Sequence, residues 1–243
     1  LQLDSNVMLE LRLIPPGRFR MGSRYGESDE QPEHWVEITR PFYMGTYPVL
    51  QSKWRTLVEN FPECGLNPTP SRFDGDRLPV EQVSWHDVTR WCELLQGNAL
   101  SSRLFDEGGN AVNLMDVSLG LPSEAQWEYS CRAGTETEYH TGDGAAALST
   151  AGWFRKNSGD TPHPVGQKKS NDFGLYDMHG NVDEWCRDAW EQNAYRKHVA
   201  GARDPVVKAS DIGESEEDAI RVIRGGSWDY SAWGCRAASR GGG

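Results

Sequence analysis

Cysteine thiols are the first residues of this 243-residue chain that could do chemistry. The five cysteines are Cys64, Cys92, Cys131, Cys186 and Cys235. Their number is odd and no Cys-x-x-Cys occurs, so the spacing encodes neither a disulfide framework nor a structural zinc site. A single disulfide is still compatible with the sequence. The pattern favours a reducing compartment such as the cytoplasm, and surface display would need an N-terminal signal ahead of this chain.

Two carboxylates could hold a metal ion in the segment LYDMHGNVDEW, residues 175–185. Asp177 and Glu184 flank a turn that is rich in backbone carbonyls. Calcium binds six to eight hard oxygens, partly from the backbone, so these residue types are compatible with it, although only the resemblance given below implies that calcium is the metal. In the alternative, Asp177 caps the turn and Glu184 pairs with a nearby arginine. His179 has no second histidine at ligand spacing, so zinc is not indicated.

The final stretch, RVIRGGSWDYSAWGCRAASRGGG, changes character at Trp228. A strand-like run and a Gly-Gly turn come before it, and Asp, Tyr, Ser, Trp and Gly follow without a helical or strand period. Rigid aromatic residues mixed with small adaptable ones are typical of antibody binding sites. The composition therefore predicts a binding surface. The alternative is an ordinary surface loop, because Asp, Ser and Gly are common in loops.

Composition excludes several classes of protein. The net charge of −11 would repel a phosphate backbone, so we expect no nucleic-acid partner. No apolar run approaches the roughly 18 residues of a membrane helix, so we expect no membrane insertion. The 26 Gly, 13 Pro and 10 Trp residues favour a fold rich in loops and anchored by aromatic side chains.

Short strands and two main helices are expected to position these residues. Residues 9–23 predict two strands around the turn at Pro15, and residues 34–49 predict one or two strands broken at Pro41. Residues 106–122 suggest a short hairpin. After Gly134 the regular pattern fades for about ninety residues, which is too long for one structureless loop in a compact domain.

The two helices are predicted over residues 84–97 and 123–134. Ser84 and Asp87 form a capping box for the first helix, which Gly97 would end. Ser123 and Gln126 form the same motif for the second.

Four segments together resemble the formylglycine-generating enzyme/sulfatase-modifying factor family: RPFYMGTYPVLQSKW, GLPSEAQWEYSCRAGT, SNDFGLYDMHGNVDEW and RVIRGGSW. Their order and spacing match the family from about residue 14 to residue 240. The resemblance implies one α+β domain over residues 1–243 with a variant of the C-type lectin-like fold and few regular elements. Family members continue to a closing Gly-Phe-Arg strand, so we expect the final C-terminal strand to be lacking here.

The family's oxidases convert a substrate cysteine to formylglycine with a copper(I) ion held by two cysteines. These are the second and seventh residues after the aromatic that follows Arg-Gly-Gly-Ser, here Trp228. Cys235 matches the seventh position, whereas Tyr230 replaces the second cysteine. A phenol is a hard donor that binds copper(I) poorly, so we expect no copper and no enzyme activity. In the competing hypothesis, Cys131 or Cys186 supplies the second thiol.

Other family members are the non-catalytic variable proteins of diversity-generating retroelements, which display a hypervariable ligand-binding surface. Their variation arises at template adenines, and asparagine codons then yield Asp, Tyr, Ser and Gly, whereas Trp can come from an Arg or Lys codon. Trp228 and Cys235 are expected to point inward. The residues expected to bind ligand are Asp229, Tyr230, Ser231, Trp233, Gly234, Ser239 and Gly241.

The resemblance also implies a ligand set for calcium. It consists of the Asp177 side chain, the Gly180 and Val182 carbonyls and the Glu184 carboxylate. The whole pattern predicts a non-catalytic protein that binds a protein or other macromolecular ligand through a diversified surface. The alternatives are the copper-dependent oxidase and a family member with a different role.

Overall fold

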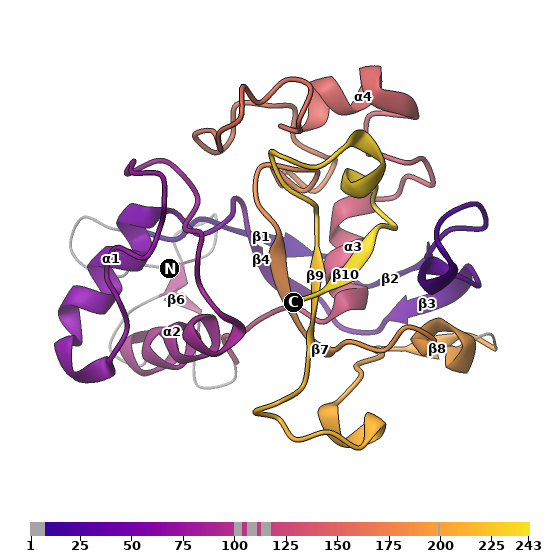
Figure 1. Cartoon of the computed structure of the whole chain (residues 1–243). Coiled ribbons are helices and arrows are strands. Elements are labelled where there is room, and N and C mark those ends of the chain that lie inside the picture. The colour runs from indigo at the N-terminus through magenta and orange to yellow at the C-terminus, as the bar shows by residue number, and fades with distance from the viewer. Residues whose placement is uncertain (1–7, 100–103, 106–110, 113–117, 199) are drawn as a thin grey trace.

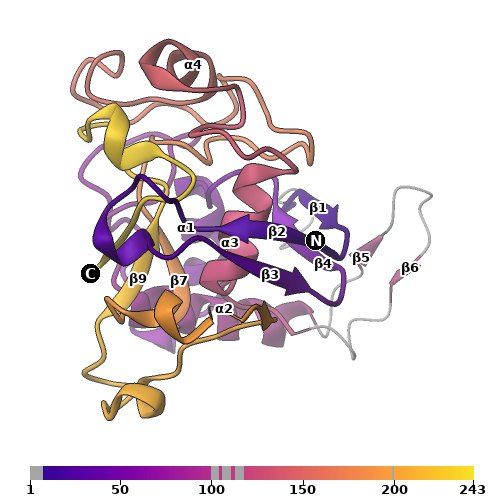
Figure 2. The same cartoon turned by 90° about the vertical axis from the view of Figure 1, so that its right-hand side faces the viewer.

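Helix α3 (Glu124–Arg132) lies at the centre of the fold, between two small sheets. The computed structural model describes residues 8–99, 104–105, 111–112, 118–198 and 200–243. The helix contacts β2 (Gly17–Met21) and β3 (His34–Ile38) on one side and β7 (Glu184–Ala189) and β9 (Arg221–Arg224) on the other (Figures 1 and 2). This arrangement confirms the predicted α+β class.

The sheets are small and mostly antiparallel. Strand β2 pairs with β3, which also pairs in parallel with β8 (Ala202–Arg203). Strand β9 is the middle strand between β7 and β10 (Arg240–Gly242). The predicted strands around Pro15 are present, but they do not pair with each other, because β1 (Leu11–Ile14) pairs with β4 (Phe42–Gly45) instead.

Most of the predicted hairpin over residues 106–122 lies outside the described residues. Its described part is the antiparallel pair β5 (Leu104–Phe105) and β6 (Ala111–Val112).

Both predicted helices are present with their capping boxes. In α3 the Ser123 hydroxyl accepts the Gln126 N–H, and the Gln126 side chain accepts the Ser123 N–H. Ser84 and Asp87 make the equivalent bonds at the start of α2 (Trp85–Ala99). The expectation that Gly97 ends α2 is wrong, since the helix continues to Ala99.

Two further helices of the described chain were not predicted. Short 3-10 turns occur between the other elements. Helix α1 (Gln51–Asn60) packs on α2, where the rings of Trp54 and Trp91 stack 5.9 Å apart. Helix α4 (Gly144–Ala151) lies within the stretch where sequence periodicity fades. Among the described residues, the 3-10 turns are η1 (Ser28–Glu30), η2 (Pro62–Cys64), η4 (Ala194–His198), η5 (Ala209–Ile212) and η6 (Ala232–Cys235).

A buried ionic network ties α3 to the C-terminal strands. The side chain of Arg224 is fully buried and bonds to Glu128, to Glu124 at 3.4 Å and to the Ala237 carbonyl at 2.7 Å. Arg240 forms two bonds with Glu124, at 2.6 and 2.7 Å. Burial alone would raise the pKa of Glu124, but Arg240 and Arg224 lower it below its usual value. The network therefore favours the charged form of the Glu124 carboxylate inside the fold.

Candidate functional site

The predicted binding residues lie on a loop, residues 228–234, that enters η6 beside α4 (Figure 1). Asp229 and Ser231 are exposed, and the exposed fractions of Tyr230 and Trp233 are 37% and 46%. Gly234 is half-buried. Four of the predicted side chains therefore face solvent: Asp229, Tyr230, Ser231 and Trp233.

The backbone of this loop faces the protein. Each of the six carbonyls from residue 228 to residue 233 accepts a hydrogen bond. The donors, in order, are Ser158 Oγ, Arg155 Nε, Arg155 N–H, Gly234 N–H, Tyr139 Oη and Arg236 Nε. None of these donors is an exposed loop side chain. The conformation of the loop is therefore set by groups other than the side chains that it displays.

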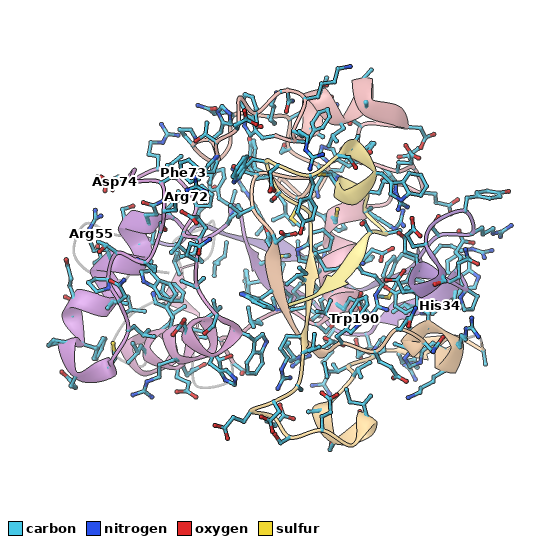
Figure 3. All side chains as sticks on the ribbon, viewed as in Figure 1. His34, Arg55, Arg72, Phe73, Asp74 and Trp190 are labelled. Atoms are coloured by element: carbon cyan, nitrogen blue, oxygen red, sulfur yellow. The ribbon has the colours of Figure 1, made fainter. Side chains whose placement is uncertain are left out.

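Trp228 forms the edge of the loop. It was expected to point inward, and it is half-buried. The ring meets the edge of Phe73 with centroids 5.7 Å apart, and Arg72 lies 5.2 Å from the Phe73 ring (Figure 3). The Trp228 N–H donates to the Asn181 carbonyl. Trp228 thus connects the loop to the segment between α1 and α2.

Tyr230 and Trp233 contact charged neighbours at the surface. The Tyr230 hydroxyl bonds to Asp183, whose pKa is raised to about 6 by burial. The Trp233 ring stacks on the Arg236 guanidinium at 3.7 Å, and its indole N–H donates to Glu27 at 3.0 Å. Both rings are therefore oriented while one side of each stays in solvent.

Ser239 and Gly241 do not lie on this loop. Ser239 follows η6, and Gly241 lies in β10 opposite Ile223. A Cβ at Gly241 would be 3.3 Å from Ile223, and one at Gly242 would be 2.8 Å from the Trp190 ring, which Figure 3 labels. The glycines of β10 therefore allow this strand to approach the neighbouring side chains closely.

The thiol at position 235 is buried, as expected. Burial and the nearby Asp183 and Asp229 raise the pKa of Cys235 to about 12. The Cys131 Sγ lies 3.5 Å from His179 Nε2, and burial raises the pKa of both Cys131 and Cys186. Within the described residues all five thiols are free, and no cluster of three or more Cys, His, Asp or Glu residues is placed to hold a metal.

The segment expected to bind calcium is a buried turn. Asp177 accepts the Gly166 N–H at 2.7 Å, and Glu184 accepts the Trp127 indole N–H at 2.8 Å. The suggested pairing of Glu184 with an arginine is therefore replaced by a bond to Trp127. Burial raises the pKa of Asp177 to about 6, and burial together with Asp177 and Asp183 raises that of Glu184 to about 7.

The donors of this turn fit calcium. Asp177 is buried and Glu184 is half-buried, and neither carboxylate forms an ion pair with a Lys or Arg among the residues that the structure places. Hard oxygens without a compensating cation are what a divalent ion would neutralise. Gly180 and Val182, which would supply the carbonyl ligands, are in the same buried turn.

A close backbone crossing positions this turn beneath the loop. A Cβ at Gly152 would lie 1.5 Å from the His179 carbonyl oxygen, and one at Gly180 would lie 2.0 Å from the Trp153 carbonyl oxygen. Asn181, next in the chain, donates its N–H to Trp153 and accepts the Trp228 N–H. The crossing therefore connects the candidate calcium segment to the displayed loop.

The residues that hold the loop could not be identified from the sequence. Arg155, Ser158 and Phe73 lie far from residue 228 along the chain, and no motif marks them. Their role depends on hydrogen bonds and ring contacts that only the folded chain brings together.

The fold and this C-terminal loop define a C-type lectin-like domain of the formylglycine-generating type. The family of the sulfatase-modifying factor enzyme 1-like domain matches residues 5–243, and the chain belongs to this family. The structure is similar to that of Treponema denticola variable protein 1, with a TM-score of 0.77 and 27% identity over 98% of this chain and 90% of that one. The family and the likeness to variable proteins predicted from the sequence are thereby confirmed.

Curated relatives differ in what they are named for. The chain is 27% identical to the chaperone protein LppX of Paenibacillus barcinonensis, over 93% of this chain and 80% of that protein. It is 29% identical to the formylglycine-generating enzyme of Mycobacterium tuberculosis, over 74% of each. It is also 29% identical to the serine/threonine-protein kinase pkn1 of Chlamydia caviae, but it spans only 35% of that protein's length. Family membership alone therefore does not choose a function.

Proposed function

We propose that this protein binds a macromolecular ligand, most simply another protein, through the side chains displayed by residues 228–234, and that it is not an enzyme. The observation that carries this proposal is that six successive loop carbonyls are held by hydrogen bonds while Asp229, Tyr230, Ser231 and Trp233 face solvent. A surface that tolerates diversification needs such a separation, because its side chains must change without moving the loop.

The exposed aromatic residues support a role in binding. Aromatic side chains are enriched among the residues that dominate interface energies. Tyr230 and Trp233 are oriented by Asp183 and Arg236, so each presents one side to a partner. The likeness to a variable protein agrees with this assignment. None of the helices in the described part of the chain is long and apolar enough to cross a membrane.

Substitution of the displayed residues should leave the fold intact. We expect Tyr230→Ala and Trp233→Ala each to lower the free energy of unfolding by about 1 kcal/mol or less, because exposed side chains contribute little to stability. The matched control is Tyr139→Ala. Tyr139 is 2% exposed and bonds to the loop from beneath, so its loss should cost about 3–5 kcal/mol. Urea denaturation of the three variants measures these differences.

A library that randomises positions 229, 230, 231 and 233 together tests whether the loop backbone keeps its conformation when the displayed side chains change. Most members of this library should resist proteolysis, and selection on immobilised proteins should yield binders. A control library at four buried positions, Tyr139, Cys235, Ala237 and Ala238, should mostly be degraded. If both libraries lose the fold equally often, the loop is a structural element and the proposal fails.

A copper-dependent oxidase is the second candidate function, and the formylglycine-generating relatives favour it. Tyr230 in place of a thiolate argues against it, because copper(I) prefers soft ligands. Anaerobic titration with copper(I), followed by an oxidation assay on a cysteine-containing peptide, separates the two functions. Tight stoichiometric copper together with turnover would establish the oxidase.

We also propose that calcium binds at Asp177 and Glu184, with the Gly180 and Val182 carbonyls completing the set. The bound ion would hold the turn that accepts the Trp228 N–H, so its role here is structural. The burial of Asp177, the raised pKa of both carboxyl groups and the lack of an ion-pairing cation among the described residues support this assignment.

Calcium should raise the melting temperature. An ion that binds only the folded state adds about 2.7 kcal/mol of stability at a hundred times its dissociation constant. We expect Asp177→Ala and Glu184→Gln to abolish the calcium-dependent rise, and Asp172→Ala, at an exposed position nearby, to retain it. Differential scanning calorimetry with calcium or with EDTA measures the effect. An unchanged melt of the wild-type protein, with no calcium by elemental analysis, would remove the site.

A further inference from the structure

A cavity of about 150 Å³ lies away from the displayed loop, near the N-terminus of α3. Strands β4 and β7 and the residue that follows β8 contribute to its lining. The proposed ligand-binding loop contributes nothing to its walls. The cavity is lined by Arg40, Pro41, Phe42, Ser123, Gln126, Arg187 and Asp204.

Most polar groups that line this cavity are hydrogen-bond donors, and these donors have no acceptor among the described residues. The guanidinium groups of Arg40 and Arg187 form no ion pair or hydrogen bond with any residue that the structure places. Gln126 uses its side-chain oxygen for the Ser123 N–H, which leaves its amide NH₂ free of described acceptors. Ser123 is 2% exposed and accepts the Gln126 N–H, so its own hydroxyl proton has no acceptor in the described part of the chain.

The single carboxylate of the lining is already satisfied. One oxygen of Asp204 accepts the Thr39 N–H at 2.9 Å, and the other accepts the Thr39 hydroxyl. Each Asp204 oxygen already has one partner, and two guanidinium charges against one carboxylate leave the lining with a net positive charge.

The backbone holds these donors in place. The Arg187 N–H donates to the Pro122 carbonyl at 2.9 Å, and the Arg187 carbonyl accepts from Arg221 at 3.2 Å. Arg40 follows Thr39, which is fixed to Asp204 by its two hydrogen bonds. Both arginines are exposed, and it is their backbone positions that these bonds anchor.

We propose that this cavity binds a phosphate group between Arg40 and Arg187, with Ser123 and Gln126 as additional donors. Arginine pairs with phosphate through two parallel charge-assisted hydrogen bonds. Two guanidinium groups, a hydroxyl and an amide offer more donors than the two oxygens of a planar carboxylate accept, and this favours a tetrahedral oxyanion. The group could belong to free inorganic phosphate or to a phosphorylated side chain of a partner.

Isothermal titration calorimetry in a phosphate-free buffer tests the proposal with two probes, inorganic phosphate and a phosphoserine peptide. We expect saturable binding with a dissociation constant on the order of 1 mM or tighter, and weakening by about tenfold in Arg40→Gln and in Arg187→Gln. Arg203→Gln is the matched control, because Arg203 is exposed on β8, pairs with Glu37 and does not line the cavity. Melting curves establish that each variant is folded.

The two probes distinguish the sources of the phosphate group. Binding of inorganic phosphate alone identifies a free ion as the ligand, and tighter binding of the peptide identifies a phosphorylated partner; either result supports the site. Three results would overturn it: no saturable binding of either probe, equal binding by acetate, or unchanged binding in the two arginine variants. None of these outcomes depends on the loop at residues 228–234.

Discussion

Arg224→Met is expected to lower the free energy of unfolding by about 3–5 kcal/mol. The change keeps much of the side-chain volume but removes the only charge that bonds to both Glu124 and Glu128 in the ionic network described above. It also leaves the Ala237 and Ala238 carbonyls without their guanidinium donor. Removing one partner of a buried pair costs far more than the pair contributes, because the remaining charge is buried without full compensation.

Denaturation with guanidinium chloride measures the free energy of unfolding of Arg224→Met, and Arg12→Met is the control variant. Arg12 pairs with Glu10 at the surface, so its loss should cost only about 0–1 kcal/mol. The pH dependence provides a further check. Because the pKa of Glu124 is lowered in the folded state, its contribution is present above the pKa of an unfolded glutamate and is lost as the pH falls through the lower folded value. An Arg224→Met variant as stable as Arg12→Met would contradict this account.

Gly152→Ala is expected to destabilise the protein by more than about 4 kcal/mol, or to prevent folding. The added Cβ would lie 1.5 Å from the His179 carbonyl oxygen, and a backbone atom cannot move aside as a flexible side chain can. Relief would require the turn at residues 177–184 to separate from residues 152–153. The loop would then lose the Asn181 carbonyl that accepts the Trp228 N–H.

The control for this change is Gly97→Ala, which should act in the opposite direction. Gly97 is exposed within α2, and a Cβ there would meet nothing within 4 Å. Alanine is favoured over glycine in a helix by about 1 kcal/mol, so the melting temperature should rise. Calorimetry of both variants measures the contrast. A stable, well-folded Gly152→Ala protein would show that the crossing can relax.

The helices that could be predicted are those with local signals. Capping boxes at Ser84 and Ser123 identified α2 and α3. Helix α1 follows Leu50, which provides no side-chain cap. Its first residue is held by distant carbonyls instead, since the Gln51 amide donates to Phe73 and Pro79. Such contacts have no sequence pattern, and this explains why α1 was missed.

The sequence could predict which residues the loop displays, but not which residues contact the loop. The resemblance to variable proteins predicted that Asp229, Tyr230, Ser231, Trp233 and Gly234 face solvent, and all of these except the half-buried Gly234 are exposed. Trp228 was expected to point inward; it is half-buried, and its contact with the distant Phe73 had no sequence pattern. The cavity near α3 could not be anticipated either, because Arg40 and Arg187 are brought together only by the packing of β3 and β7 around α3.

The hydrogen-bonded carbonyls of residues 228–233 also bear on how substitutions combine. Free-energy effects add when sites share no partners and fail to add when a change at one site moves another. Since scaffold groups and the loop's own backbone hold each carbonyl, replacing Asp229 or Ser231 should not shift the position of Trp233. Tyr230 and Gly234 form the coupled pair, because a Cβ at Gly234 would lie 3.1 Å from the Tyr230 ring. At the other loop positions, we expect the effects of substitutions on ligand affinity to add, with little epistasis between positions.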